Sequence, residues 1–271
     1  MSQIAIAQVS SSTGKRDNLE TALRWIREAR SRDAELVAFP EFLMAFSPAG
    51  QSADELCRLA EPADGPFVAA LAEAARRYGI DVVATIYENC PAPNRVYDTA
   101  LWVDRTGRIA SLYRKLHLYD AFGFKESEKF YPGDEVAPLV AVGDARFGMM
   151  ICYDLRFPEM ARVLTLLGAN VIVAPSGWVQ GDLKLDHWQT MLKARALENG
   201  CYVIAPGQTG NIYIGHSLAV DPLGRILADL GEEEGLAVVQ LDPALVSETR
   251  EKLPLLKNRR TDVYARYPLG K

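Results

Sequence analysis

The chain has 271 residues, of which 49% are hydrophobic, and its formal net charge of −5 at pH 7 corresponds to a pI near 5.4. This length and apolar content can fill a substantial core, and the acidic balance argues against a general binder of nucleic acids or anionic membranes. The four cysteines are widely spaced with no Cys-x-x-Cys pair and the three histidines are scattered, so the sequence indicates neither a dithiol redox centre nor a metal site.

The first half of the chain alternates short apolar strands with amphipathic helices. In chain order we predict a strand near 3–9, a helix near 16–32, a strand at 35–39, a helix near 64–78 and a strand at 81–87. A hairpin that turns at Gly107 follows at 100–109. Residues 116–145 are then predicted to form a long loop, and loops of that length are usually functional or disordered.

The second half repeats this order, ending in a hairpin at 217–226 that parallels 100–109. The predicted elements are a strand at 146–151, a helix at 158–167, a strand at 170–174, a helix near 185–199 and a strand at 201–205. The central strands, such as 82–84 and 172–174, are apolar on both faces, so each sheet must be covered twice. We therefore predict an α/β protein, a four-layer α–β–β–α sandwich of two pseudo-repeated halves that forms a single domain over 1–271.

Three reactive side chains follow predicted strands. Glu41 comes directly after 35–39, in apolar surroundings that make it a usable proton acceptor near neutrality. Lys115 follows a strand predicted at 108–112, and Cys152 stands where a strand gives way to a helix that begins at Pro158. Each has an ordinary explanation as a turn, solvated or packed residue, but α/β proteins build their sites at strand ends.

The local sequences around these residues resemble the motifs of the nitrilase, or carbon–nitrogen hydrolase, superfamily. FPEF stands at 39–42, RKLHL at 114–118 and CYDLRFPE at 152–159, in the order that the family has them. The resemblance extends over nearly the whole chain and implies the same α–β–β–α sandwich.

The resemblance also implies a Glu-Lys-Cys triad that acts without a metal or organic cofactor. Cys152 would attack the substrate to form a thioester, with Glu41 as the base and Lys115 as the oxyanion donor. The backbone N–H of Tyr153 would be a second oxyanion donor. The family's second glutamate is matched best by Glu126, with the neighbouring Glu128 as the alternative.

The sequence after the nucleophile is most similar to the ω-amidase and deaminated-glutathione-amidase branch. The expected activity is hydrolysis of the C–N bond of a small carboxylated amide, with release of ammonia and a carboxylic acid. Tyr153, Arg156 and Trp178 are the candidate substrate-binding residues. A substrate carboxylate needs a cation, and Arg156, Lys129 and Arg195 are candidates by charge alone.

Several alternatives remain open at this stage. Within the family they are an N-carbamoyl amino acid or carbamoyl-amine hydrolase and a nitrilase. Outside it they are a ligand-binding or assembly protein that retains the fold, and a thiol redox protein, although Cys201 is the next cysteine and no resolving thiol is near in sequence. His216 is predicted to be structural.

The C-terminal segment from about residue 253 has no place in either repeat, so we expect it to pack on a partner subunit in a homodimer or higher homo-oligomer. The other expected partner is a small-molecule amide, with no nucleic acid and no membrane. No apolar run is long enough to span a bilayer, and an enzyme that needs a free thiol suits the reducing cytoplasm.

Overall fold

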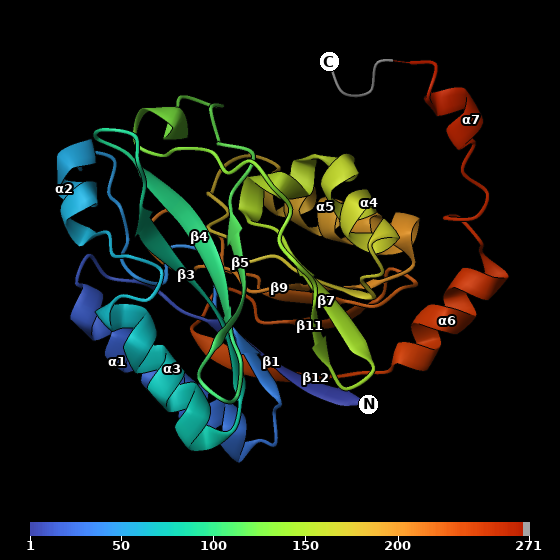
Figure 1. Ribbon diagram of the computed structural model, residues 1–271, viewed down its shortest axis with the longest axis horizontal. Coiled ribbons are helices and arrows are strands. Elements are labelled where there is room, and N and C mark those ends of the chain that lie inside the picture. Colours follow the sequence, from blue (N-terminus) through green and yellow to red (C-terminus); the bar gives the residue numbers. More distant parts are fainter. Residues whose placement is uncertain (268–271) are drawn as a thin grey trace.

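The computed structural model describes residues 1–267, which contain two six-stranded sheets packed face to face (Figure 1). In the first sheet β1, β2 and β3 are parallel, while β4, β5 and β12 join antiparallel to their neighbours. Its order is β12 (Gly235–Leu241), β1 (Ser2–Gln8), β2 (Leu36–Ala38), β3 (Asp81–Asn89), β4 (Val96–Val103) and β5 (Ile109–Arg114).

The second sheet has a corresponding arrangement, with β7, β8 and β9 parallel and the outer strands antiparallel. Its order is β11 (Ile226–Asp229), β10 (Leu218–Val220), β9 (Tyr202–Ala205), β8 (Val171–Val173), β7 (Ala145–Met149) and β6 (Val140–Val142). The shared pattern of three parallel strands followed by a hairpin confirms the predicted pseudo-repeat.

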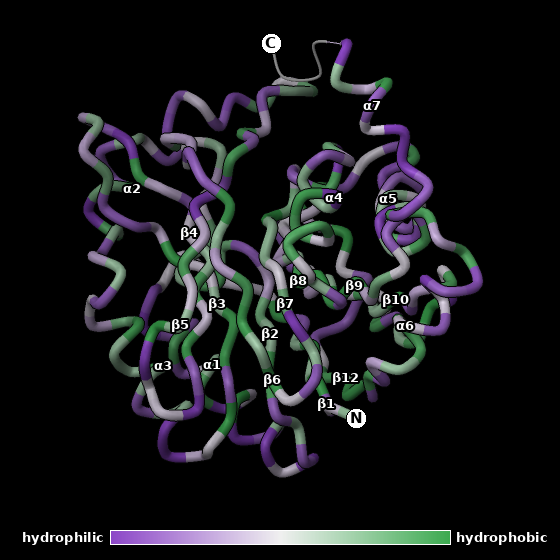
Figure 2. Tube along the Cα trace, turned by 45° about the vertical axis from the view of Figure 1, so that its right-hand side comes forward, coloured by the Kyte–Doolittle hydropathy of each residue, from purple (hydrophilic) through white to green (hydrophobic). Residues whose placement is uncertain are grey.

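Helices cover the outer face of each sheet, which confirms the four-layer sandwich (Figures 1 and 2). The first sheet carries α1 (Lys15–Ser31) and α3 (Pro66–Tyr78), and the second carries α4 (Pro158–Leu166) and α5 (Lys184–Asn199). Between the sheets the core is continuous: Trp102 of β4 contacts Phe147 of β7 with ring centroids 5.0 Å apart. Figure 2 shows the resulting segregation, with hydrophobic strands inside and hydrophilic segments at the periphery.

Local sequence explains where these helices begin and end. α3 begins with Pro66, which suits the first helical turn, and its C-cap Gly79 has φ 63°. α5 likewise ends at Gly200, with φ 54°. In both cases glycine supplies the left-handed conformation that stops a helix without a Cβ penalty.

Some elements were not predicted. The segment predicted as one long loop contains a short 3-10 helix, η1 (Glu126–Glu128), and the edge strand β6. β12 pairs with β1 in the first sheet over seven residue pairs, so the end of the chain completes the sheet in which the chain begins. The others are the helices α2 (Ala53–Leu59), α6 (Pro243–Lys252) and α7 (Thr261–Tyr264).

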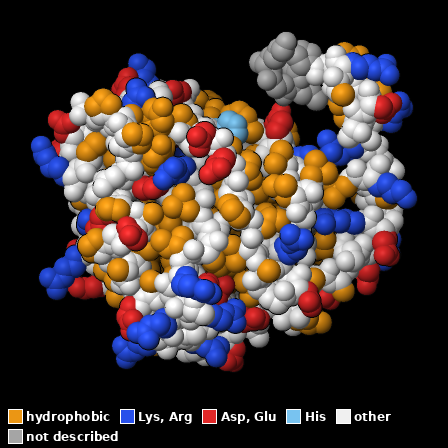
Figure 3. Space-filling model, in the orientation of Figure 1, with side chains coloured by type: hydrophobic (Ala, Val, Ile, Leu, Met, Phe, Trp, Pro, Cys, Tyr) orange, Lys and Arg blue, Asp and Glu red, His pale blue; other side chains and the backbone are white. Residues whose placement is uncertain are grey.

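The C-terminal segment leaves the body of the molecule as an arm that carries α7, and basic side chains are prominent along it (Figures 1 and 3). Its packing on a partner subunit stays a prediction, as do the homodimer and the division of the chain into one domain. None of the helices described within residues 1–267 is long and apolar enough to cross a membrane.

Candidate active site

Three strand ends bring the predicted triad together. Glu41 lies just beyond β2, Lys115 directly follows β5, and Cys152 lies beyond β7 at the start of a 3-10 turn. β5 runs in the same direction as β2, because two antiparallel steps separate it from the parallel strand β3. The carboxyl ends of these strands therefore meet at one edge of the sandwich, where α/β proteins commonly bind ligands.

Lys115 is the centre of an ion-pair cluster. Its Nζ lies 2.7 Å from Glu41 Oε1 and 2.9 Å from Glu126 Oε2, and its side chain is 1% exposed. Burial alone would lower the pKa of Lys115, but the carboxylates of Glu126, Glu41 and Asp98 raise it well above its ordinary value. The lysine therefore stays protonated, and a fixed ammonium is a strong donor to an oxyanion.

Glu41 is held from two sides. Its Oε1 accepts from Lys115, and its Oε2 accepts a 2.6 Å hydrogen bond from the backbone N–H of Gly177. Gln208 fixes the backbone of Glu41 by donating to its carbonyl oxygen at 2.9 Å. A larger residue at position 177 would displace Glu41, because a Cβ there would lie 3.0 Å from Glu41 Oε2.

Cys152 occupies a tight turn with φ 42°, a left-handed conformation that non-glycine residues rarely adopt. Its N–H donates to Pro175 O at 3.0 Å, and the buried Asp154 braces the turn by accepting from the N–H of Ile151 at 2.8 Å and from the hydroxyl of Tyr113 at 2.6 Å. Strained backbone of this kind is often found at functional sites.

The thiol of Cys152 is neutral at rest. Burial raises its pKa well above the ordinary value, the carboxylate of Glu41 adds to the effect, and Lys115 only partly opposes them. A neutral thiol is a weak nucleophile, so the reaction needs a base that takes the proton as sulfur attacks. Glu41 is the carboxylate with the largest effect on the pKa of Cys152, which agrees with its predicted role as this base.

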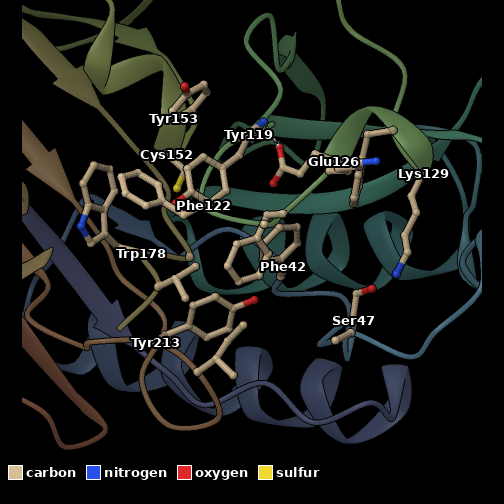
Figure 4. Close-up of a pocket in the computed structure, with 18 of the residues that line it drawn as sticks. Phe42, Ser47, Tyr119, Phe122, Glu126, Lys129, Cys152, Tyr153, Trp178 and Tyr213 are labelled. Carbon is tan, nitrogen blue, oxygen red and sulfur yellow. Dashed lines mark hydrogen bonds between the residues drawn. The ribbon is translucent and has the colours of Figure 1, made fainter. Parts of the chain in front are cut away.

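A cavity of about 690 Å³ opens onto Cys152 (Figure 4). Its walls are largely aromatic, with Phe42, Tyr119, Phe122, Phe130, Tyr153, Trp178 and Tyr213 among the lining side chains. The three predicted substrate-binding residues all line this cavity, and the guanidinium of Arg156 lies 4.8 Å above the ring of Trp178. An apolar pocket with a few charged groups is the usual form of a small-molecule site.

The comparisons with known proteins decide the family. The carbon–nitrogen hydrolase model matches residues 3–251. The chain belongs to the carbon–nitrogen hydrolase family. It is 37% identical over 257 residues to the deaminated glutathione amidase of Escherichia coli O157:H7, covering 95% of this chain and 97% of that protein.

Two solved structures confirm the fold of this carbon–nitrogen hydrolase. The NitFhit protein of C. elegans matches with a TM-score of 0.90 and 32% identity, over 97% of this chain and 66% of that longer one. An amidase from Nesterenkonia sp. AN1, seen with the result of Michael addition of acrylamide at its active-site cysteine, matches with a TM-score of 0.81 and 26% identity, over 98% and 99% of the two chains. The protein is thus a hydrolase of non-peptide carbon–nitrogen bonds, of the amidase type.

The structure also shows where the remaining candidate residues of the hydrolase lie. Glu126 reaches Lys115, whereas Glu128 is exposed and lies 3.4 Å from Lys125. Lys129 lines the cavity. His216 is structural in its contacts, with Nδ1 2.9 Å from Asp229 Oδ1.

Arg195 was wrong as a candidate for the substrate carboxylate. It does not line the cavity; its Nε donates to Leu155 O and its Nη1 to Glu198 Oε1, both at 2.9 Å. Helical spacing explains the outcome, because Glu198 is one turn away on α5 and so supplies the partner for its charge.

Two functional candidates were missed. Asp98 on β4 is 2% exposed, with Oδ2 3.7 Å from Lys115 Nζ and with neither oxygen hydrogen-bonded to any residue of 1–267. The sequence of β4 could have indicated that Asp98 is buried. Side chains alternate along a strand, so Asp98 lies on the same face as the core residues Ala100 and Trp102. Lys184, the first residue of α5, also lines the cavity.

Asp98→Asn should stabilise the protein increasingly as pH rises. Burial, and then the carboxylate of Glu41, raise the pKa of Asp98 well above its ordinary value. A raised pKa contributes stability that is full below the unfolded-state pKa of about 4 and is lost as pH rises through the folded-state pKa. Asparagine has the shape of the neutral acid but does not titrate, so the variant keeps its stability between these two pKa values.

Urea unfolding at pH 5 and pH 8 measures this effect. The free energy of unfolding of Asp98→Asn relative to the unsubstituted protein should grow with pH by up to about 1.4 kcal/mol per unit within that window. A difference that stays constant with pH would show that Asp98 is ionised in the folded protein. Asp104→Asn is the control: hydrogen bonds from Thr106 and Arg108 lower the pKa of Asp104, so this carboxyl is ionised in both states above about pH 5 and the difference in unfolding free energy should stay constant between pH 5 and pH 8.

Proposed function

We propose that the protein hydrolyses a carboxylated amide through a thioester on Cys152, with no cofactor in the cycle. The observation that carries the proposal is the buried Lys115, which is held between Glu41 and Glu126, together with a cavity that both Glu126 and Cys152 line. A fixed cation beside a nucleophile and a carboxylate base is the arrangement that acyl transfer requires.

In the first half of the cycle Cys152 attacks the amide carbon while Glu41 takes the thiol proton. The carbonyl oxygen becomes an oxyanion that Lys115 and the backbone N–H of Tyr153 stabilise, and losing one such donor typically costs about 2.7–4 kcal/mol of barrier. The C–N bond then breaks, and Glu41 returns the proton to the departing nitrogen. The products are ammonia or an amine and an acyl thioester.

In the second half water replaces the leaving group. Glu41 removes a proton from the water, which attacks the thioester carbon, and the same donors hold the second oxyanion. The C–S bond breaks and the thiolate recovers the proton from Glu41. The acid leaves and the neutral thiol is restored.

The cavity supports an anionic substrate of some size. Arg156 and Lys129 line it, and neither has a carboxylate within 4 Å among residues 1–267. A volume of about 690 Å³ is more than succinamate needs. An amide with a larger leaving group, such as the deaminated glutathione named for the Escherichia coli relative, therefore joins 2-oxoglutaramate and succinamate as a proposed substrate.

A hydrolysis screen tests the proposal. The panel is succinamate, 2-oxoglutaramate, deaminated glutathione, N-carbamoyl amino acids and simple nitriles, with acid, ammonia or amine, and carbon dioxide measured as products. We expect turnover of the carboxylated amides only. Carbon dioxide from the carbamoyl compounds would favour the runner-up activity, and turnover of nitriles alone would reject an amidase.

The proposed mechanism also favours a reducing compartment, because the thiol has to stay free. We therefore place the enzyme in the cytoplasm. Fractionation of cells that produce it, followed by immunodetection, tests this location, and recovery outside the cytoplasmic fraction would reject it.

A further inference from the structure

Lys184 is a buried cation without a counter-ion. Its residue is 9% exposed, and it lines the cavity that opens onto Cys152. Its Nζ lies 2.8 Å from the hydroxyl of Tyr119 and 4.5 Å from the ring centroid of Phe122, but no carboxylate of residues 1–267 lies within 4 Å. A hydroxyl and two aromatic faces stabilise an ammonium only partly, so this arrangement leaves a positive charge uncompensated.

The fold does not explain a lysine at this position. Lys184 is the first residue of α5, and a cation there opposes the positive end of the helix dipole. The hydrogen bond from Trp178 Nε1 goes to the backbone carbonyl of Lys184, at 2.9 Å, and would form with any side chain. Burial and position therefore both disfavour the charge, which points to a ligand that compensates it.

Tyr119 connects the ammonium of Lys184 to the candidate active site. The backbone N–H of Tyr119 donates to Glu126 Oε2 at 2.7 Å, and the ring of Tyr119 meets that of Tyr153 edge-on with centroids 5.0 Å apart. Tyr153 follows the nucleophile Cys152, and Figure 4 shows Tyr119 and Phe122 beside Cys152. Tyr119 thus contacts Lys184 through its hydroxyl, Glu126 through its backbone, and the neighbour of the nucleophile through its ring.

Arg156 is a second cation beside Trp178. The guanidinium of Arg156 lies over the ring of Trp178, whose Nε1 holds the backbone of Lys184. Trp178 therefore contacts both the guanidinium of Arg156 and the backbone of Lys184, and both of these residues line the cavity. Two donors of this kind can bind the two oxygens of one carboxylate.

We propose that Lys184 and Arg156 form the subsite that binds the carboxylate of the substrate's acyl portion, and that Lys184 determines specificity for anionic amides. This rests on the proposed function, because it assumes that an amide is the substrate. The acyl portion remains bound as the thioester, so the subsite acts in both halves of the cycle.

The test compares Lys184→Met with the unsubstituted enzyme on two amides. Succinamate carries the carboxylate, and 4-methylpentanamide has an uncharged isopropyl group in its place. We expect kcat/KM of Lys184→Met for succinamate to fall about 30-fold or more, with 4-methylpentanamide changed less than about 3-fold. Lys184→Arg should recover part of the loss, and Lys252→Met, which removes an exposed charge on α6, should leave both values unchanged.

A structural role for Lys184 predicts a different result. It would lower the melting temperature of Lys184→Met and reduce turnover of both amides alike, which would overturn the proposal. We expect instead that removing an uncompensated buried charge keeps or raises the melting temperature.

Binding of succinate, measured by calorimetry, tests the subsite without turnover. Succinate should bind the unsubstituted protein and Lys252→Met equally, and Lys184→Met at least about 30-fold more weakly. Equal binding to Lys184→Met, or no binding to the unsubstituted protein, would overturn the subsite. Binding without hydrolysis of any amide would reject the proposed function and leave the subsite supported.

Discussion

Cys152→Ala should abolish amide hydrolysis, lowering kcat by at least about 10⁴-fold. The thioester route has no substitute for the sulfur, because the neighbouring Glu41 and Lys115 are already paired with each other. The fold should survive, since alanine fits the space of cysteine and the turn is braced by the hydrogen bonds of Asp154 rather than by the thiol. Product release and a thermal melt measure the two effects.

Cys201 is the matched control for this prediction. It is fully buried and its burial raises its pKa to about 12, so it is an unreactive packing residue. Cys201→Ala should keep full activity, with some loss of stability from the small cavity. If Cys152→Ala retained more than about 1% of activity, the thioester mechanism would be wrong.

Much of the fold could be predicted because the periodicity is local. The parallel strands of both halves are short apolar runs, and their helices have clear stop signals such as Gly79 and Gly200. β12 was missed because its place beside β1 depends on pairing between the two ends of the chain. No feature of the sequence around 235–241 identifies that partner.

The candidate site also contains residues that could be predicted and residues that could not. Glu41, Lys115 and Cys152 lie at strand ends within recognisable motifs, so their meeting could be predicted, and the choice of Glu126 over Glu128 agrees with the geometry. Their catalytic roles stay predictions. Asp98 and Lys184 could not be placed, because nothing in the sequence around them indicates the site.

Asp98 and Lys184 show why some site residues cannot be predicted from the sequence. Asp98 appears in the sequence as one polar residue in a strand, and its importance comes only from the distance of 3.7 Å to Lys115. Lys184 lies at a predicted helix start, where a charged residue is ordinarily solvated. What distinguishes it is burial beneath Tyr119 and Phe122, which belong to another segment.

Glu41→Gln should suppress turnover at least about 10³-fold, whereas Glu126→Gln should lose only about 10-fold. Glutamine at 41 cannot take a proton in either half of the cycle. It is also mismatched, because Oε1 accepts from Lys115 and Oε2 from the N–H of Gly177, and the amide NH₂ group has to face one of these donors.

Glu126 has a milder requirement. Its Oε2 accepts from Lys115 at 2.9 Å and from the N–H of Tyr119 at 2.7 Å, so the carbonyl oxygen of glutamine can keep both hydrogen bonds. The NH₂ group then replaces Oε1, and only the longer 3.1 Å hydrogen bond from Lys115 to Oε1 is lost. Glu126 thus acts through Lys115 as a positioning residue, and its substitution should affect the orientation of the lysine rather than proton transfer.

Single-turnover release of the amine or ammonia distinguishes the two glutamates. The burst should disappear in Glu41→Gln and persist at a reduced rate in Glu126→Gln, while Glu128→Gln, at an exposed site paired with Lys125, should match the unsubstituted enzyme. Equal inactivity of Glu126→Gln and Glu41→Gln would give Glu126 a direct catalytic role. Loss of activity in Glu128→Gln alone would contradict this assignment. It would mean that Glu128, and not Glu126, positions Lys115 during turnover.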